Sequence, residues 1–155
     1  MSAFFTVKFL LLLVTSACGS VAFAIIYRVN VKYLPLAALG GVLTYFVYHA
    51  VAFLGMGVFA AALLSAAFSA LFSEVFAKIK KAPVSIFLLP CSIPIVPGSE
   101  LYYTMASFIS RDFSAAFYHL GQALGIGLGI AAGIVIVPIV WQLCFALLKA
   151  FRVKV

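Results

Sequence analysis

Five long apolar runs, separated by short polar links, make up most of the chain. They cover about residues 9–27, 33–54, 58–77, 83–110 and 117–148. An α-helix needs roughly 20 apolar residues to cross the ~30 Å hydrocarbon core of a bilayer, and each run is about that long or longer. The pattern predicts an all-α integral membrane protein with about five transmembrane helices, all in a single transmembrane domain covering residues 1–155.

The first run has a competing interpretation as a signal peptide, since Thr15-Ser16-Ala17-Cys18 faintly resembles a lipoprotein cleavage site. Thr15 is an unfavourable residue at that distance before the cysteine. The apolar sequence also continues to Tyr27 without a polar cleavage region. A retained transmembrane helix is the better prediction.

The fourth run differs from the others because prolines interrupt it. Pro90, Pro94 and Pro97 are followed directly by Gly98. Each proline removes a backbone donor and clashes with the preceding turn, so the group predicts a helix broken at its Pro-x-x-Pro-Gly segment. One half-helix is expected to end near residues 90–94. A second is expected to begin near Gly98, with Ser99 as its N-cap and Glu100 in its first turn.

Composition supports the membrane assignment. The chain is 67% hydrophobic and 8% charged, whereas soluble domains carry about 25% charged residues. The chain has ten Lys and Arg against three acids, an excess that could indicate a nucleic-acid partner. However, the basic residues lie at the ends of the apolar runs rather than on one face. We therefore expect a lipid bilayer as the surroundings and no nucleic-acid partner.

The basic residues also predict an orientation. With five spans, the first link, the third link and the C-terminus share one side of the membrane. That side holds eight basic residues: Arg28, Lys32, Lys78, Lys80, Lys81, Lys149, Arg152 and Lys154. The opposite side holds Lys8 and Arg111. The positive-inside rule then places the N-terminus outside and the C-terminus in the cytoplasm.

The broken fourth run is the candidate functional segment, because freed backbone groups in hydrocarbon must be satisfied by protein, water or a ligand. The predicted substrate pathway consists of Pro94, Pro97, Gly98, Ser99, Glu100, Tyr102 and Tyr103. The candidates for a proton relay are Glu100, His49 and Glu74. The alternatives are a kinked structural helix without a ligand, a histidine satisfied by packing, and a Glu74–Lys78 pair. His119, Arg111 and Asp112 are interpreted as boundary residues.

Small residues at helical spacing predict close helix packing, within the chain or between chains. They are Gly121, Gly125, Gly129 and Gly133 in the last run, and Ser65, Ser69 and Ser73 in the third. No phosphate-binding loop, metal-ligand cluster or nucleophile–histidine–acid arrangement is visible in the sequence. We expect no cofactor, no metal and no enzymatic activity.

Four segments together resemble the threonine/serine exporter family: Ser73-Glu74, Lys81-Ala82-Pro83, Pro90 to Gly98, and Leu101-Tyr102. The chain looks most like the family's small stand-alone subunit, which is related to the C-terminal membrane domain of full-length exporters. The resemblance implies gradient-driven export of a small carboxylate-bearing metabolite, threonine or serine, or a dicarboxylate such as succinate. It also implies a larger partner subunit and a multi-pass location in the bacterial inner membrane.

Three functions are consistent with these features. The first is a transporter subunit with Glu100 and the broken helix at its centre. The second is an accessory or scaffold membrane protein that stabilises a partner, or a second copy of itself, through its small-residue faces. The third is a channel, whose flux would not respond to a proton gradient.

Overall fold

Helices form all of the regular structure among the described residues of this computed structural model. The backbone is described for residues 2–152 and the side chains for residues 9–143. The elements are α1 (Ser2–Ile26), η1 (Val31–Tyr33), α2 (Leu34–Phe53), α3 (Val58–Lys80), α4 (Ser85–Ser92), η2 (Ile93–Ile95), α5 (Gly98–Ile109) and α6 (Phe113–Arg152). The prediction of an all-α fold is confirmed over this range.

Four stretches are long and apolar enough to cross a membrane: Phe9–Ile26, Val31–Phe53, Val58–Lys80 and Phe113–Leu143. A fifth crossing arises if the pair Ser85–Ile95 and Gly98–Ile109, bent by 46°, is one span. The break falls where the prolines predicted it. The described residues therefore contain four or five candidate membrane spans.

Three of the helices end at a basic residue whose backbone has a left-handed conformation. Arg28, Lys81 and Arg111 have φ angles of 54°, 52° and 60°. After each of them, the next amide donates back to a carbonyl five residues earlier, as from Ala82 N to Ala77 O at 3.0 Å. This closes the last helical turn in the manner of a Schellman motif. A cation at a helix C-terminus is also stabilised by the helix dipole.

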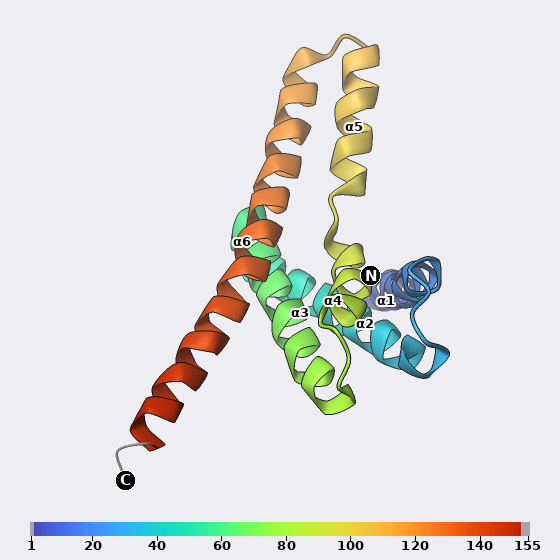
Figure 1. Ribbon diagram of the computed structural model, residues 1–155. Coiled ribbons are helices and arrows are strands. Elements are labelled where there is room, and N and C mark those ends of the chain that lie inside the picture. Colours follow the sequence, from blue (N-terminus) through green and yellow to red (C-terminus); the bar gives the residue numbers. More distant parts are fainter. Residues whose placement is uncertain (1, 153–155) are drawn as a thin grey trace.

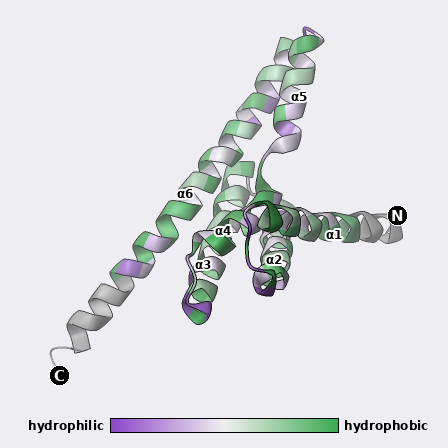
Figure 2. Ribbon diagram, turned by 45° about the vertical axis from the view of Figure 1, so that its right-hand side comes forward, coloured by the Kyte–Doolittle hydropathy of each residue, from purple (hydrophilic) through white to green (hydrophobic). Residues whose placement is uncertain are grey.

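The helices form two parts that share α6 (Figure 1). Helices α1 to α4 pack together, and α3 lies along the middle of α6. Helix α5 and the first part of α6 form an antiparallel hairpin that stands away from α1 and α2, and α6 is the main packing partner of α5. Figure 2 shows hydrophobic residues along most of the helices and hydrophilic residues gathered near their ends.

Burial is reversed relative to a soluble protein. The hydroxyl residues Ser20, Thr44, Ser65, Ser69 and Ser73 have an exposed fraction of 0%. Large apolar side chains point outward along every long helix, for example Leu128 with 64% of its surface exposed. Such an exterior is stable in hydrocarbon, where apolar groups need no cover and polar groups must be satisfied inside.

The predicted small-residue rows lie in different environments. A Cβ at Gly133 would meet Leu63 O at 2.5 Å, and one at Gly129 would meet Phe59 O at 2.6 Å, so α6 and α3 are in close backbone contact there. Gly125 has only an ordinary contact with Val58, and Gly121 has nothing within 4 Å. The α3 side chains that face these glycines are alanines, Ala62 and Ala66.

The serine row of α3 is buried but bonds mostly to its own helix. The Ser65 hydroxyl donates to the carbonyls of Ala61 and Ala62, and that of Ser73 donates to Ser69 O at 2.7 Å. Ser69 Oγ has no hydrogen-bond partner among the described residues. The row therefore fills a tightly packed helix face without forming links between helices through Ser65 or Ser73.

Candidate functional site

The break is formed by one 3₁₀ turn and two residues with non-helical backbone. Pro94 lies in the 3₁₀ turn η2, Val96 is extended (φ −63°, ψ 131°), and α5 begins at Gly98. Glu100 lies in the first turn of α5, as predicted. The prediction that Ser99 is the N-cap is wrong, because Ser99 is already inside the helix. Pro97 occupies the cap position, and no side chain caps α5.

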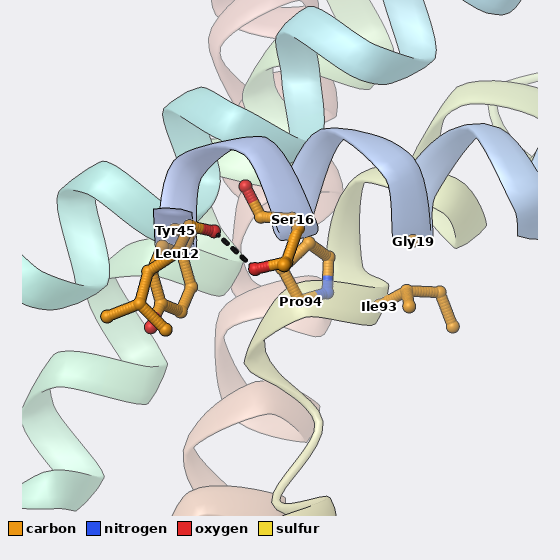
Figure 3. A pocket seen from close by; sticks show the side chains of 7 residues that line it. Leu12, Ser16, Gly19, Tyr45, Ile93 and Pro94 are labelled. Carbon is orange, nitrogen blue, oxygen red and sulfur yellow. Dashed lines mark hydrogen bonds between the residues drawn. The ribbon is translucent and has the colours of Figure 1, made fainter. Parts of the chain in front are cut away.

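A pocket of about 260 Å³ opens beside the break (Figure 3). Its walls come from α1, α2 and the 3₁₀ turn: Leu12, Thr15, Ser16, Gly19, Tyr45, Ile93 and Pro94. The volume lies just below the lower end of the range for pockets that hold drug-sized ligands. It is therefore of a suitable size for a metabolite as small as an amino acid.

The polar atoms of this pocket are hydroxyls. Thr15 Oγ1 donates to Leu12 O at 2.9 Å, and Ser16 Oγ donates to Leu13 O at 2.7 Å. Because each hydroxyl proton is used within α1, the oxygens retain lone pairs that can accept from a ligand. Two buried hydroxyls nearby, those of Ser20 one turn after Ser16 and of Thr44 next to Tyr45, have no hydrogen-bond partner among the described residues.

Helix α2 carries a tyrosine of the pocket wall and, one turn later, a candidate relay histidine. The Tyr45 hydroxyl, at the pocket wall, makes a 2.9 Å hydrogen bond with His49 Nε2. Tyr48, on the same helix, lies close enough to Glu100 to interact with its charge. His49 is thus held by Tyr45 and by ring contacts, including an edge contact with Phe9 at 6.0 Å between centroids.

The charged part of the site is a contact between Glu100 and His119. His119 Nδ1 lies 2.7 Å from Glu100 Oε2, which joins α5 to α6. Each side chain is about one quarter exposed, at 27% for His119 and 26% for Glu100. Among the residues that the structure describes, this is the only salt-bridge contact.

Side chains from α5 complete the surroundings of this pair. The Tyr103 ring lies against the His119 ring, with centroids 5.3 Å apart and an angle of 31°. Thr104 Oγ1 donates to the Glu100 carbonyl at 2.7 Å and is 5% exposed. Tyr102 touches Tyr103 edge-on but is 68% exposed, so it points away from the pair.

Glu74 does not join this group. It lies half-buried in the second half of α3 and makes no hydrogen bond or salt bridge with Glu100, His49 or His119 in the described part of the chain. The predicted Glu74–Lys78 pair is also not among the salt bridges of that part. The Lys78 ammonium lies 4.3 Å from the centroid of the Trp141 ring on α6.

His119 is the site residue that sequence reasoning missed, since it was interpreted as a boundary residue. The available signal was the short polar turn at Arg111 and Asp112. A turn of that length joins antiparallel helices, so residues on its two sides come to lie opposite each other. Glu100 and His119 are such a pair, although they are 19 residues apart.

The described residues contain no group of three or more His, Cys, Asp or Glu side chains that could hold a metal ion. Cys18 is exposed and Cys91 is buried, and both are free.

Comparison with known proteins places this arrangement in a family. The family model described as "Threonine/Serine exporter, ThrE" matches residues 12–140. The chain belongs to the threonine/serine exporter family. The matched range of this exporter includes the break, the pocket, Glu100 and His119. No curated protein and no solved structure matches the exporter chain.

Family membership and the apolar helices together make the chain a multi-pass membrane protein of the transporter type. The exporter family suggests a transporter rather than an enzyme.

Proposed function

We propose that the chain is the membrane subunit of a secondary transporter that exports threonine or serine from a bacterial cell. The observation that carries the proposal is the position of Glu100. It lies in the first turn of α5, the second half-helix of the broken candidate span. In the sequence it follows Ile93 and Pro94, the residues of the break that line the pocket. Ionisable residues inside membranes are costly and mark substrate or ion pathways.

The chemistry of the site favours an amino acid. A carboxylate at position 100 attracts a substrate ammonium group and repels a dianion. The uncapped N-terminus of α5 offers free amides and a positive dipole end for the substrate carboxylate. The hydroxyls of the pocket are suited to the side-chain hydroxyl of threonine or serine. Succinate, with two carboxylates and no ammonium group, fits this site less well.

We further propose that the subunit works with a larger partner subunit in the bacterial inner membrane, with its N-terminus outside and its C-terminus in the cytoplasm. The exposed part of the Glu100–His119 pair supports a partner, because a quarter-exposed carboxylate is expensive in lipid and needs cover by protein or water. The scaffold alternative is weakened because Gly129 and Gly133 are already in contact with the chain's own α3.

The test is gradient-driven flux of labelled threonine, serine and succinate in proteoliposomes, with the chain alone and with its candidate partner subunit. We expect flux of the two amino acids with both chains present, and its loss in Glu100→Gln. Asp112→Asn is the matched control, because Asp112 is exposed and caps Ala115 N at 3.1 Å, a role that asparagine also fills. If Glu100→Gln transports normally, or if the chain only stabilises its partner, the transporter proposal is wrong.

A further inference from the structure

The Glu100–His119 contact has a charge that depends on how many protons it holds. With one proton between them, the two side chains carry no net charge, whether as two neutral groups or as carboxylate and imidazolium. With no proton, the pair carries one negative charge. In a medium of low dielectric constant the uncharged form is strongly favoured, since an uncompensated buried charge is costly.

No other described residue neutralises the pair. The titratable groups near it are tyrosines: Tyr103 on α5 and Tyr118 on α6 have ring contacts with His119, and Tyr48 on α2 is near enough to be affected by the charge of Glu100. Neither a lysine nor an arginine forms a salt bridge with Glu100 in the described part of the chain. The negative charge of the deprotonated pair must therefore be compensated by water or by a bound cationic group.

We propose that Glu100 and His119 share one proton when the site is empty, and that the substrate's ammonium group displaces this proton at the same carboxylate. The inference rests on the proposed export of an amino acid and assigns the two residues at which a proton and the substrate compete. Proton and ammonium group each bring one positive charge to one negative site, so they occupy it alternately. His119 is the positioning residue that holds the proton against Glu100 in the empty state.

Alternation of this kind produces antiport. The proton enters from the outer side, binds the empty pair and is released to the cytoplasm when the substrate ammonium group arrives. The substrate leaves outward, and a proton from the outside restores the uncharged pair. One proton moves inward for each zwitterion that moves outward. Because the zwitterion is neutral, one positive charge enters per cycle, and a membrane potential that is negative inside also drives export.

The experiment compares two kinds of flux in the same proteoliposomes, which contain the chain with its partner subunit. Net flux of labelled threonine is driven by a pH gradient, and threonine–threonine exchange is measured at equal pH on both sides. The test variant is His119→Asn, whose amide nitrogen occupies about the place of Nδ1 but does not titrate. His119→Gln is the second variant, and Asp112→Asn is the control.

In His119→Asn we expect gradient-driven flux to fall about tenfold or more, because the variant loses the charge-assisted hydrogen bond that holds the proton between the two side chains. The gradient-driven flux of this variant should also depend less on pH. Exchange should stay within about threefold of wild type, because Glu100 still binds the ammonium group and net proton transfer is not needed. In the wild type, adding threonine should release protons, detected with a pH-sensitive dye.

Two results would overturn the inference. One is gradient-driven flux with a wild-type pH profile in both His119 variants. The other is an equal loss of exchange and net flux in variants that elute as the folded protein, which would make His119 a purely structural residue. Absence of both threonine and serine exchange in the wild type would instead overturn the proposed function itself. A wild type that exchanges threonine but releases no proton would contradict the displacement of a shared proton and leave the proposed export in place.

Discussion

The acid at position 100 is paired with a histidine and not with a lysine or arginine. Its partner is a histidine, a side chain with a neutral and a cationic form, and tyrosine rings rather than fixed cations surround the pair. A lysine or arginine in place of His119 would keep the carboxylate charged throughout a transport cycle. With histidine as its partner, the Glu100 carboxylate can pair instead with a cationic group of a ligand.

Tyr45 belongs both to the pocket wall and to the hydrogen bond with His49. Tyr45→Phe removes this hydroxyl and leaves the ring in place. We expect the half-saturation concentration for threonine to rise about two- to tenfold, since a neutral hydrogen bond contributes roughly 0.5–1.5 kcal/mol. Maximal flux should change little. The measurement is the concentration dependence of flux in proteoliposomes, with Tyr27→Phe as a control because Tyr27 is exposed at the end of α1. Equal half-saturation values for Tyr45→Phe and the control would argue against a substrate in this pocket.

Single residues differ in how far the sequence could predict them. Glu100 could be identified because its significance comes from its immediate neighbours, the prolines and glycine just before it. Its contact with His119 depends on how a hairpin closes, which the hydropathy of either residue does not encode. Ser99 was assigned to the cap because serine favours that position. Pro97 takes it because a residue without a backbone donor loses nothing at the start of a helix.

At the scale of helices, α3 and α6 form the most extensive helix–helix contact among the described residues, and they run parallel. Contacts advance in the same direction along both, from Gly125 with Val58 to Gly133 with Leu63. This register explains why only Gly129 and Gly133 of the glycine row are in close contact with α3. Gly121 lies beyond the first residue of α3, where α6 has left that helix and pairs with α5. The spacing of the row was visible in the sequence, but the point where the partner helix begins was not.

Substitutions in this row should have opposite effects at its two ends. In Gly133→Ala the new methyl group would meet Leu63 O at 2.5 Å and the Ala66 Cβ at 2.8 Å, so α3 and α6 must separate. We expect a loss of about 1–3 kcal/mol in stability, typical of overpacking. In the matched variant Gly121→Ala nothing lies within 4 Å, and the helix should gain roughly 0.5–1 kcal/mol from the lower entropy of its unfolded chain.

The measurement is thermal unfolding of the two variants in the same detergent. A Gly133→Ala variant as stable as Gly121→Ala would contradict the close contact between α3 and α6.

For the whole molecule, the parallel course of α3 and α6 bears on the number of membrane crossings. Two parallel helices that both span the bilayer cross it in the same direction. The chain between them must then return across the bilayer once, and that chain is the bent pair α4–α5. A re-entrant loop would return the chain to the side on which α3 ends, and α6 would then run antiparallel to α3. The packing therefore favours five crossings over four, in agreement with the distribution of basic residues.

Labelling of single cysteines tests this topology in intact cells. With Cys18, Cys91 and Cys144 replaced by serine, new cysteines are placed by Met56→Cys, Lys80→Cys and Ser110→Cys, all at exposed helix ends or links. Five crossings with the N-terminus outside predict that a membrane-impermeant maleimide labels positions 56 and 110 from outside, and position 80 only after the membrane is permeabilised. If the bent pair re-enters instead, positions 110 and 80 lie on the same side and are protected together. If position 80 alone is labelled in intact cells, the chain has five crossings but the opposite orientation. The number of crossings was inferred from the α3–α6 packing, whereas the orientation was inferred from the basic residues. The pattern at these three positions thus separates an error in the charge argument from an error in the packing argument.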